Sequence, residues 1–163
     1  MRREYLSSIL AIILMIEIGS SSAWAQSGKA AAQSIGLLGT WAADCTKPAT
    51  PINWFITYEA DADGHLHALY NHGDKGGPLL AIVESVRVQS PTTVATRLHY
   101  QDPRWGKNSD GAVFDMILEL KDGHKQTVYS VRVNGGVVVK DRLNVLSGKA
   151  ADIHERCLAR PVA

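Results

Sequence analysis

The sequence lacks the short motifs that mark common hydrolase active sites. It has no G-x-S-x-G nucleophile turn and no H-E-x-x-H zinc pair. Asp61 and Asp63 are typical turn residues rather than an acid–base pair, and Gly135-Gly136 belongs to a hairpin rather than to a phosphate cradle. The sequence therefore points to no catalytic residue and no cofactor, and a non-enzymatic role is the expectation.

An excess of charge of either sign is also missing. The whole chain has 17 basic and 16 acidic side chains, and the first 25 residues hold two of each: Arg2, Arg3, Glu4 and Glu17. The remaining residues therefore hold 15 basic and 14 acidic side chains. Such a balance gives no electrostatic basis for binding nucleic acid or an anionic membrane surface.

Only one long apolar run occurs, from Leu6 to Ile18, and it lies behind the basic pair Arg2-Arg3. Ala23-Trp24-Ala25 then has the small-x-small form of a signal-peptidase site, so residues 1–25 are predicted to be a Sec-type signal peptide cleaved after Ala25. An uncleaved anchor is the alternative, but the run is short for a membrane span, which takes about 20 residues. The expected location is periplasmic or secreted, with no span after cleavage.

A helical period over a dozen residues is absent after the signal segment. We expect a flexible lead-in over 26–36, a domain over 37–158 and a tail over 159–163. Turn residues divide the domain into eight predicted strands and a short terminal segment, 154–158. The predicted strands are 37–45, 52–60, 65–71, 79–88, 92–100, 112–121, 125–133 and 137–146. This pattern predicts an all-β fold, an antiparallel up-and-down barrel of about eight strands, with a two-sheet sandwich as the rival.

The two cysteines, Cys45 and Cys157, both lie in the predicted domain. An even count in an exported chain favours a disulfide, here linking the first strand to the C-terminal segment. A metal pair or a redox couple is the alternative, but the C-x-x-C spacing of either is missing.

The start of the domain, Leu37-Leu38-Gly39-Thr40-Trp41, resembles the G-x-W of lipocalins and related calycin barrels. The longer run 39–48, together with Glu155-Arg156-Cys157, is similar to small exported proteins of unknown function from α-proteobacteria. In lipocalins an arginine near the end of the barrel packs on this tryptophan, so the resemblance implies Arg156 or Arg142 over Trp41. The C-terminal helix of lipocalins has no counterpart here.

Three groups of side chains are candidates for binding. Aromatic residues on strand faces that could point inward would line a ligand pocket or fill the core: Trp54, Tyr58, Tyr70, Tyr100, Phe114 and Tyr129. In the loop 101–111, Arg104, Trp105 and Lys107 are candidates for contact with a partner, although Trp105 could equally fold back as a lid. His65 and His67 are weak metal candidates, with His72, His99 or Asp115 as a possible third ligand.

Two functions follow as expectations. The preferred one is an exported lipocalin-like module that binds a small, partly apolar ligand. The alternative is an envelope protein-interaction or enzyme-inhibitor module that acts through the loop 101–111.

Overall fold

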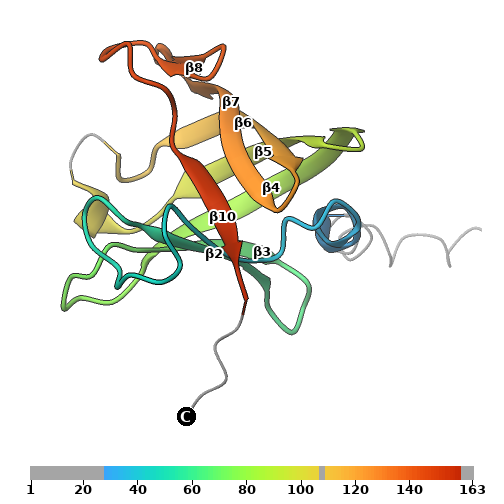
Figure 1. The fold of residues 1–163 in the computed structure, drawn as a ribbon, viewed down its shortest axis with the longest axis horizontal. Coiled ribbons are helices and arrows are strands. Elements are labelled where there is room, and N and C mark those ends of the chain that lie inside the picture. Colours follow the sequence, from blue (N-terminus) through green and yellow to red (C-terminus); the bar gives the residue numbers. More distant parts are fainter. Residues whose placement is uncertain (1–27, 107–108, 159–163) are drawn as a thin grey trace, which may run out of the picture.

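The computed structural model of the chain describes residues 28–106 and 109–158. The predicted signal peptide, the candidate Lys107 and the tail 159–163 lie outside these residues. Figure 1 shows the fold, whose named elements are β1 (Gly39–Ala42), β2 (Phe55–Ala60), β3 (Leu66–Asn71), β4 (Leu79–Ser90), β5 (Thr93–Tyr100), η2 (Pro103–Trp105), β6 (Val113–Lys121), β7 (His124–Arg132), β8 (Val137–Lys140), β9 (Leu143–Asn144) and β10 (Ile153–Cys157).

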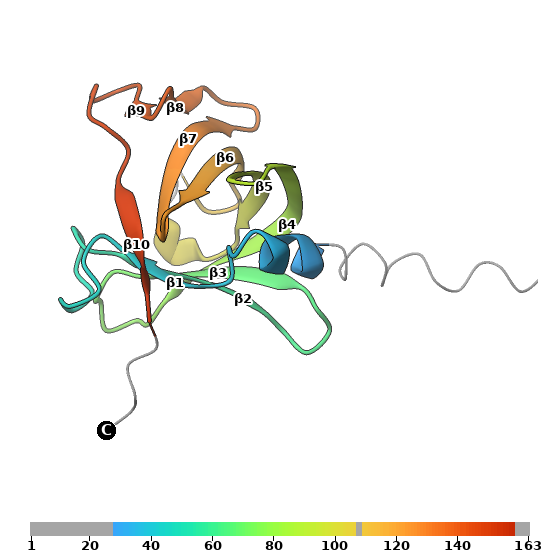
Figure 2. The ribbon, with the colours of Figure 1, turned by 45° about the vertical axis from the view of Figure 1, so that its right-hand side comes forward.

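The predicted all-β barrel is confirmed. Strands β1 to β7 pair antiparallel in chain order, and β10 pairs with both β1 and β7, which closes an eight-stranded barrel. The first half of β10 lies beside β7, with His154 opposite Lys125, and its second half lies beside β1, with Arg156 opposite Trp41. Figure 2 shows β10 running between these two strands. Closure leaves none of the eight barrel strands with a fully unpaired edge.

The eighth barrel strand is not the one that the sequence predicts. Residues 137–146 divide into β8 and β9, which pair with each other as a hairpin beside β7. Asp141 and Arg142 form the turn, with φ angles of 51° and 64°. Two successive positive φ angles are typical of a tight hairpin turn, which usually contains glycine or asparagine. Because this turn contains neither glycine nor asparagine, the sequence predicts one continuous strand over 137–146. In the structure the terminal segment β10 is the eighth barrel strand instead.

The lead-in predicted over 26–36 is also different in the structure. Residues 28–34 form a helix, and Ala32 is fully buried in the core. The helix ends at Gly36, whose φ is 72°, where the amide of Gly36 donates to the carbonyl of Gln33 and that of Leu37 to the carbonyl of Ala32. This is the Schellman pattern of helix termination. Consecutive alanines favour the helix, and its packing against the barrel stabilises it.

Apolar side chains fill the part of the barrel next to this helix. Val94, Leu98 and Leu118 are fully buried there. A Cβ atom on Gly28 would lie 3.7 Å from Leu66, the first residue of β3, so the helix packs at that end of the strand. Tyr70 lies near the opposite end of β3. The interior is therefore packed toward the helix, and any space for a ligand lies toward Tyr70.

Trp41 and Arg156 form the contact that the lipocalin resemblance implies. The indole of Trp41 is 2% exposed and donates to the carbonyl of Leu37 at 2.9 Å. The guanidinium of Arg156 lies 5.8 Å from the centre of the Trp41 ring and donates to the carbonyl of Leu38. Gly39, with φ at 120°, lies directly under that guanidinium. Arg142 instead pairs with Glu119, so Arg156 takes the position over Trp41.

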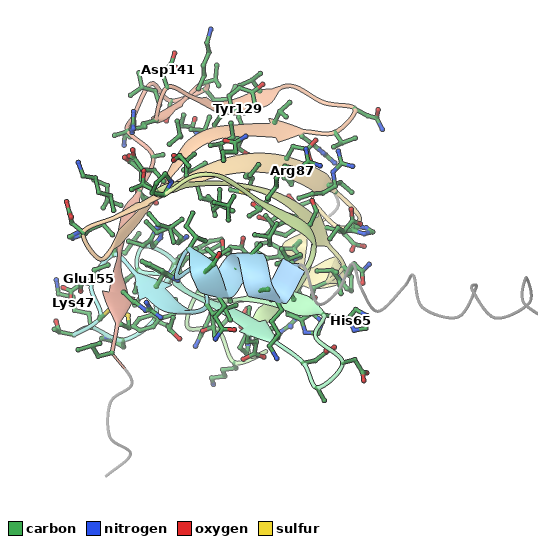
Figure 3. The ribbon with its side chains drawn as sticks, turned by 90° about the vertical axis from the view of Figure 1, so that its right-hand side faces the viewer. Lys47, His65, Arg87, Tyr129, Asp141 and Glu155 are labelled. Atoms are coloured by element: carbon green, nitrogen blue, oxygen red, sulfur yellow. A yellow bond between two sulfur atoms is a disulfide. The ribbon has the colours of Figure 1, made fainter. Side chains whose placement is uncertain are left out.

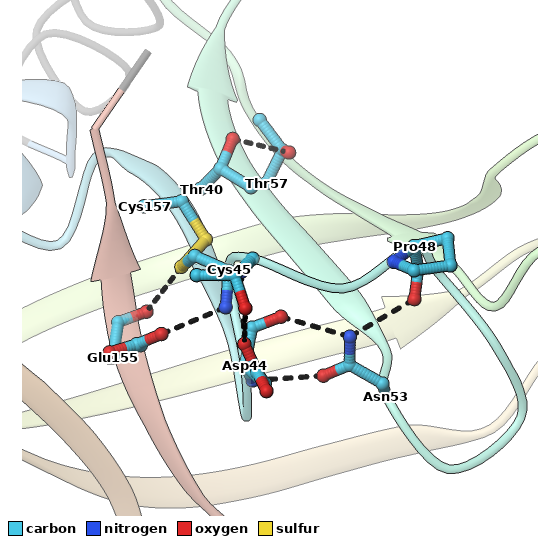
Figure 4. Close-up of a disulfide and its surroundings, with 9 residues drawn as sticks. Thr40, Asp44, Cys45, Pro48, Asn53, Thr57, Glu155 and Cys157 are labelled. Carbon is cyan, nitrogen blue, oxygen red and sulfur yellow. Dashed lines mark hydrogen bonds between the residues drawn. A yellow bond between two sulfur atoms is a disulfide. The ribbon is translucent and has the colours of Figure 1, made fainter. Parts of the chain in front are cut away.

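The disulfide Cys45–Cys157 forms, with a sequence separation of 112 residues. Cys45 lies just after β1, in the segment that leads to β2. The amide of Cys45 donates to the carboxylate of Glu155, and the buried Asn53 holds the same segment by bonds to the backbone of Asp44 and Pro48 (Figure 4). The disulfide and Asn53 therefore fix the segment 43–53 at one end of the barrel.

Candidate functional site

A cavity of about 380 Å³ lies in the barrel, at the end away from the helix 28–34. Its walls come from strands β2, β3, β5, β6, β7 and β10, and its mouth from the segment fixed by the disulfide. The lining residues are Ala43, Pro51, Ile52, Trp54, Ile56, Tyr58, Tyr70, Tyr100, Met116, Lys125, Thr127, Asp152 and His154. The volume falls within the range of small-molecule sites, which is about 300–1,000 Å³.

Four of the six predicted pocket residues line this cavity: Trp54, Tyr58, Tyr70 and Tyr100. The hydroxyl of Tyr100 donates to that of Tyr70 at 3.2 Å. Burial is the main cause that raises the pKa of all three tyrosines above the usual value of 10. Their phenols therefore stay neutral at ordinary pH.

The other two predicted pocket residues lie elsewhere. Phe114 packs edge-on against Tyr100, with ring centres 5.2 Å apart, and is not among the lining residues. Tyr129 is opposite Ile117 in the ladder, on the face of the sheet that points away from the cavity residue Met116. Figure 3 shows Tyr129 on the outer side of β7. The prediction for Tyr129 is therefore wrong.

A β-bulge in β7 explains the error. Ile117 and Leu118 are adjacent in β6, yet their partners in β7 are Tyr129 and Thr127, so Val128 is an extra residue. Strict alternation would put Lys125, Thr127 and Tyr129 on one face, but the bulge reverses the face between Thr127 and Tyr129. Lys125 and Thr127 consequently point into the cavity.

Lys125 is the residue that the sequence analysis missed. Its side chain is only 4% exposed, and its amine lies 5.3 Å from the centre of the Tyr58 ring. Burial lowers the pKa of Lys125 from the ordinary 10.5 to about 7. Lys125 comes two positions after an Asp-Gly turn, where a lysine is usually exposed to solvent. No local signal in the sequence therefore indicates that this lysine is buried.

His154 is the partner of Lys125 across the β7–β10 ladder. Burial, and then the nearby charge of Lys125, lowers the pKa of His154 to about 4. The imidazole is therefore neutral at ordinary pH. The cavity thus combines aromatic walls with one amine, one neutral imidazole, several hydroxyl groups and the carboxylate of the exposed Asp152.

Trp105 packs against three of the aromatic residues that line this cavity. Its ring centre lies 4.6 Å from that of Tyr100, 5.1 Å from Tyr70 and 6.1 Å from Trp54. Its indole donates to the carbonyl of Leu80 at 3.1 Å. Of the two roles considered for Trp105, the structure shows the lid that folds back onto the barrel.

Arg104 is likewise engaged within the protein. Its guanidinium donates to the carboxylate of Asp102 and to the backbone carbonyls of Gly76, Gly77 and Pro78. These bonds tie the loop 101–111 to the connection between β3 and β4. The loop therefore presents neither Arg104 nor Trp105 as an unengaged anchor for a partner.

The histidine candidates do not assemble the predicted metal site among the described residues. His65 and His67 both approach Asp61, at 3.3 and 3.9 Å, and Figure 3 shows His65 at the surface. The three suggested third ligands have other partners: His72 lies near Asp74, His99 near Glu84, and Asp115 binds Arg97. The ligand atoms of Asp61, Asp63 and His65 do converge. These residues lie in a turn at the surface, where acidic side chains commonly gather without binding a metal.

Two surface features lie outside the cavity. A hollow of about 870 Å³ runs over the outer side of the disulfide, between Phe55 and Leu158. Exposed apolar side chains also gather around the β8–β9 hairpin, with Leu146 at 95% exposure the most prominent. Neither feature presents a buried polar group of the kind that Lys125 offers in the barrel.

Searches against protein-family models, curated proteins and solved structures returned no match for this chain. Among the residues that the structure describes, no helix has both the length and the apolar character needed to cross a membrane.

Proposed function

We propose that this chain is an exported binding module for a small, partly apolar ligand, which it holds inside the barrel. The observation that carries the proposal is the cavity of about 380 Å³ at the end of an otherwise packed barrel. An eight-stranded barrel can be filled entirely by its own side chains, so space left among buried rings calls for an explanation.

The chemistry of the walls favours a ligand with an apolar, ring-bearing body. Trp54, Tyr58 and Met116 supply broad apolar surfaces, and the tyrosine hydroxyls supply a few directional contacts. This combination of mostly apolar walls and a few polar groups is typical of small-molecule sites.

Two further observations support the export and the barrel type. The disulfide is of the kind that persists in oxidising compartments, which agrees with the signal peptide predicted over 1–25. The contact of Arg156 with Trp41 agrees with the lipocalin resemblance. The alternative function, a partner bound through the loop 101–111, has less support, because the indole of Trp105 and the guanidinium of the exposed Arg104 already bond within the protein.

Isothermal titration of residues 26–163 with naphthalene-2-carboxamide, a neutral ring-bearing probe, tests the proposal. We expect saturable binding of one molecule per chain. Thr127→Phe places a ring in the cavity and should abolish this binding. Thr93→Phe is the matched control, because Thr93 is opposite Glu119 on the outer face of the barrel and does not line the cavity.

Binding that survives Thr127→Phe would place the probe elsewhere and contradict the proposal. Native mass spectrometry of the protein purified from its own export compartment gives an independent test. A non-covalent adduct that is present in the parent chain and absent in Thr127→Phe supports the cavity as the binding site.

A further inference from the structure

The amine of Lys125 has no ion-pair or hydrogen-bond partner among the described residues. Its side chain is buried, and its amine lies over the face of the Tyr58 ring, 5.3 Å from the ring centre. Asp152 is the one carboxylate that lines the cavity, but it is an exposed residue at the mouth and forms no ion pair with Lys125. Buried lysines are rare in proteins unless they are paired, so the missing partner is informative.

Three groups that face this amine carry no negative charge. Tyr58 faces it from β2, the neutral imidazole of His154 lies opposite on β10, and Leu120 is its apolar neighbour on β6. An ammonium group donates three hydrogen bonds and accepts none. The complement of this arrangement is an acceptor that carries negative charge and is attached to an apolar body.

We propose that the ligand is a small organic acid whose anionic group pairs with Lys125 while its apolar part lies against Trp54, Tyr58 and Met116. This inference rests on the function proposed above and specifies the chemical class of its ligand. It assigns two tasks to the cavity: the aromatic walls bind the body of the ligand, and Lys125 selects for charge.

Proton uptake should accompany binding. In the empty cavity burial holds the pKa of Lys125 near 7, so above that pH most molecules carry a neutral amine. An anion beside the amine favours the ammonium form, so binding at about pH 8 draws a proton from solution. The other titratable groups that face this space are His154, the three tyrosines and the exposed Asp152 at the mouth. The lowered pKa of His154 and the raised pKa values of the tyrosines keep these side chains neutral.

Titration with a matched pair of probes tests the inference. Naphthalene-2-carboxylate and naphthalene-2-carboxamide share one ring system and differ in charge. In chloride-free buffer the parent protein should bind the carboxylate roughly 10- to 100-fold more tightly, because a charge-assisted hydrogen bond gives selectivity of that order. Repeating the carboxylate titration at about pH 8, in buffers of different ionisation enthalpy, should show uptake of nearly one proton.

Lys125→Met removes the amine and keeps an unbranched side chain that is one atom shorter. It should lose the preference for the carboxylate and the proton uptake, but retain binding of the carboxamide. Lys140→Met is the control, because it makes the same substitution at an exposed site on β8. Circular dichroism of both variants verifies that they fold.

The two proposals fail in distinguishable ways. If the parent binds both probes equally, or if Lys125→Met keeps the preference for the carboxylate, the inference about Lys125 is overturned and the binding function stands. If neither probe binds to the parent protein, the proposed function itself fails, and the inference fails with it.

Discussion

Replacing Lys125 with methionine should make the empty protein more stable. The fall in the pKa of Lys125 from 10.5 to about 7 corresponds to a cost of about 4 kcal/mol at neutral pH. Methionine is nearly as long and has no charge to desolvate. Even for buried ion pairs, which are better compensated than a lone amine, replacement by apolar side chains is often neutral or stabilises proteins by about 1–4 kcal/mol. We therefore expect Lys125→Met to raise the free energy of unfolding by about 1–4 kcal/mol at neutral pH, in the absence of ligand.

The pH dependence gives this prediction its sharpest form. Between about pH 7 and 10.5 the unfolded chain binds the lysine proton and the folded chain releases it, so stability rises with pH across that window. The cost is complete below the folded pKa and disappears above the unfolded one. From about pH 7 to pH 9 the parent should gain about 2 kcal/mol, and Lys125→Met should lack that gain.

Urea unfolding followed by circular dichroism, at several pH values in this range, measures both effects. Lys140→Met serves again as the control and should follow the parent. A Lys125→Met variant that is less stable than the parent, or that keeps the same rise with pH, would refute the claim that Lys125 is a buried and unpaired amine.

Three further changes test other parts of the fold. Replacing Cys45 and Cys157 together by alanine should lower the free energy of unfolding by about 4–5 kcal/mol, since the disulfide closes a loop of 112 residues. Urea unfolding with and without reductant measures this effect, and a parent protein that is equally stable in both conditions would contradict it. Trp105→Ala should cost about 2–4 kcal/mol in the same assay by removing the lid from the aromatic cluster, whereas a loss below about 0.5 kcal/mol would mean that the lid does not pack. Gly39→Ala should lower the free energy of unfolding by about 1–3 kcal/mol, because the φ angle of Gly39 is 120°. Gly136→Ala should be nearly neutral, because an added Cβ meets no atom within 4 Å. Similar thermal unfolding of both variants would argue against strain at Gly39.

Much of the architecture follows from local signals in the sequence. Alternating apolar residues and glycine-containing turns such as Asn134-Gly135 predict most of the strands, because both signals depend only on neighbouring residues. The disulfide also follows from the sequence, since two cysteines in a chain with a predicted export signal allow one pairing. The aromatic residues of β2, β3 and β5 were placed correctly because those strands keep regular alternation up to the cavity.

Local signals fail where the sheet departs from regular pairing. Asp141-Arg142 turns the chain without glycine, so the sequence predicts the closing strand over 137–146 instead of at β10. In the same way, three alanines before Gly36 form a helix only because the barrel offers a surface on which Ala32 is buried.

Turn residues and alternating apolar residues act over a few positions, so they predict the antiparallel strands, favour a barrel over a two-sheet sandwich and, with the two cysteines, predict one disulfide. Which groups meet inside the barrel depends instead on how distant strands pair. The extra residue Val128 turns Lys125 inward and Tyr129 outward, and closure by β10 brings His154 opposite that lysine. Both outcomes depend on pairing between strands that are distant in the chain, and a bulge anywhere along a strand reverses the face of every residue beyond it.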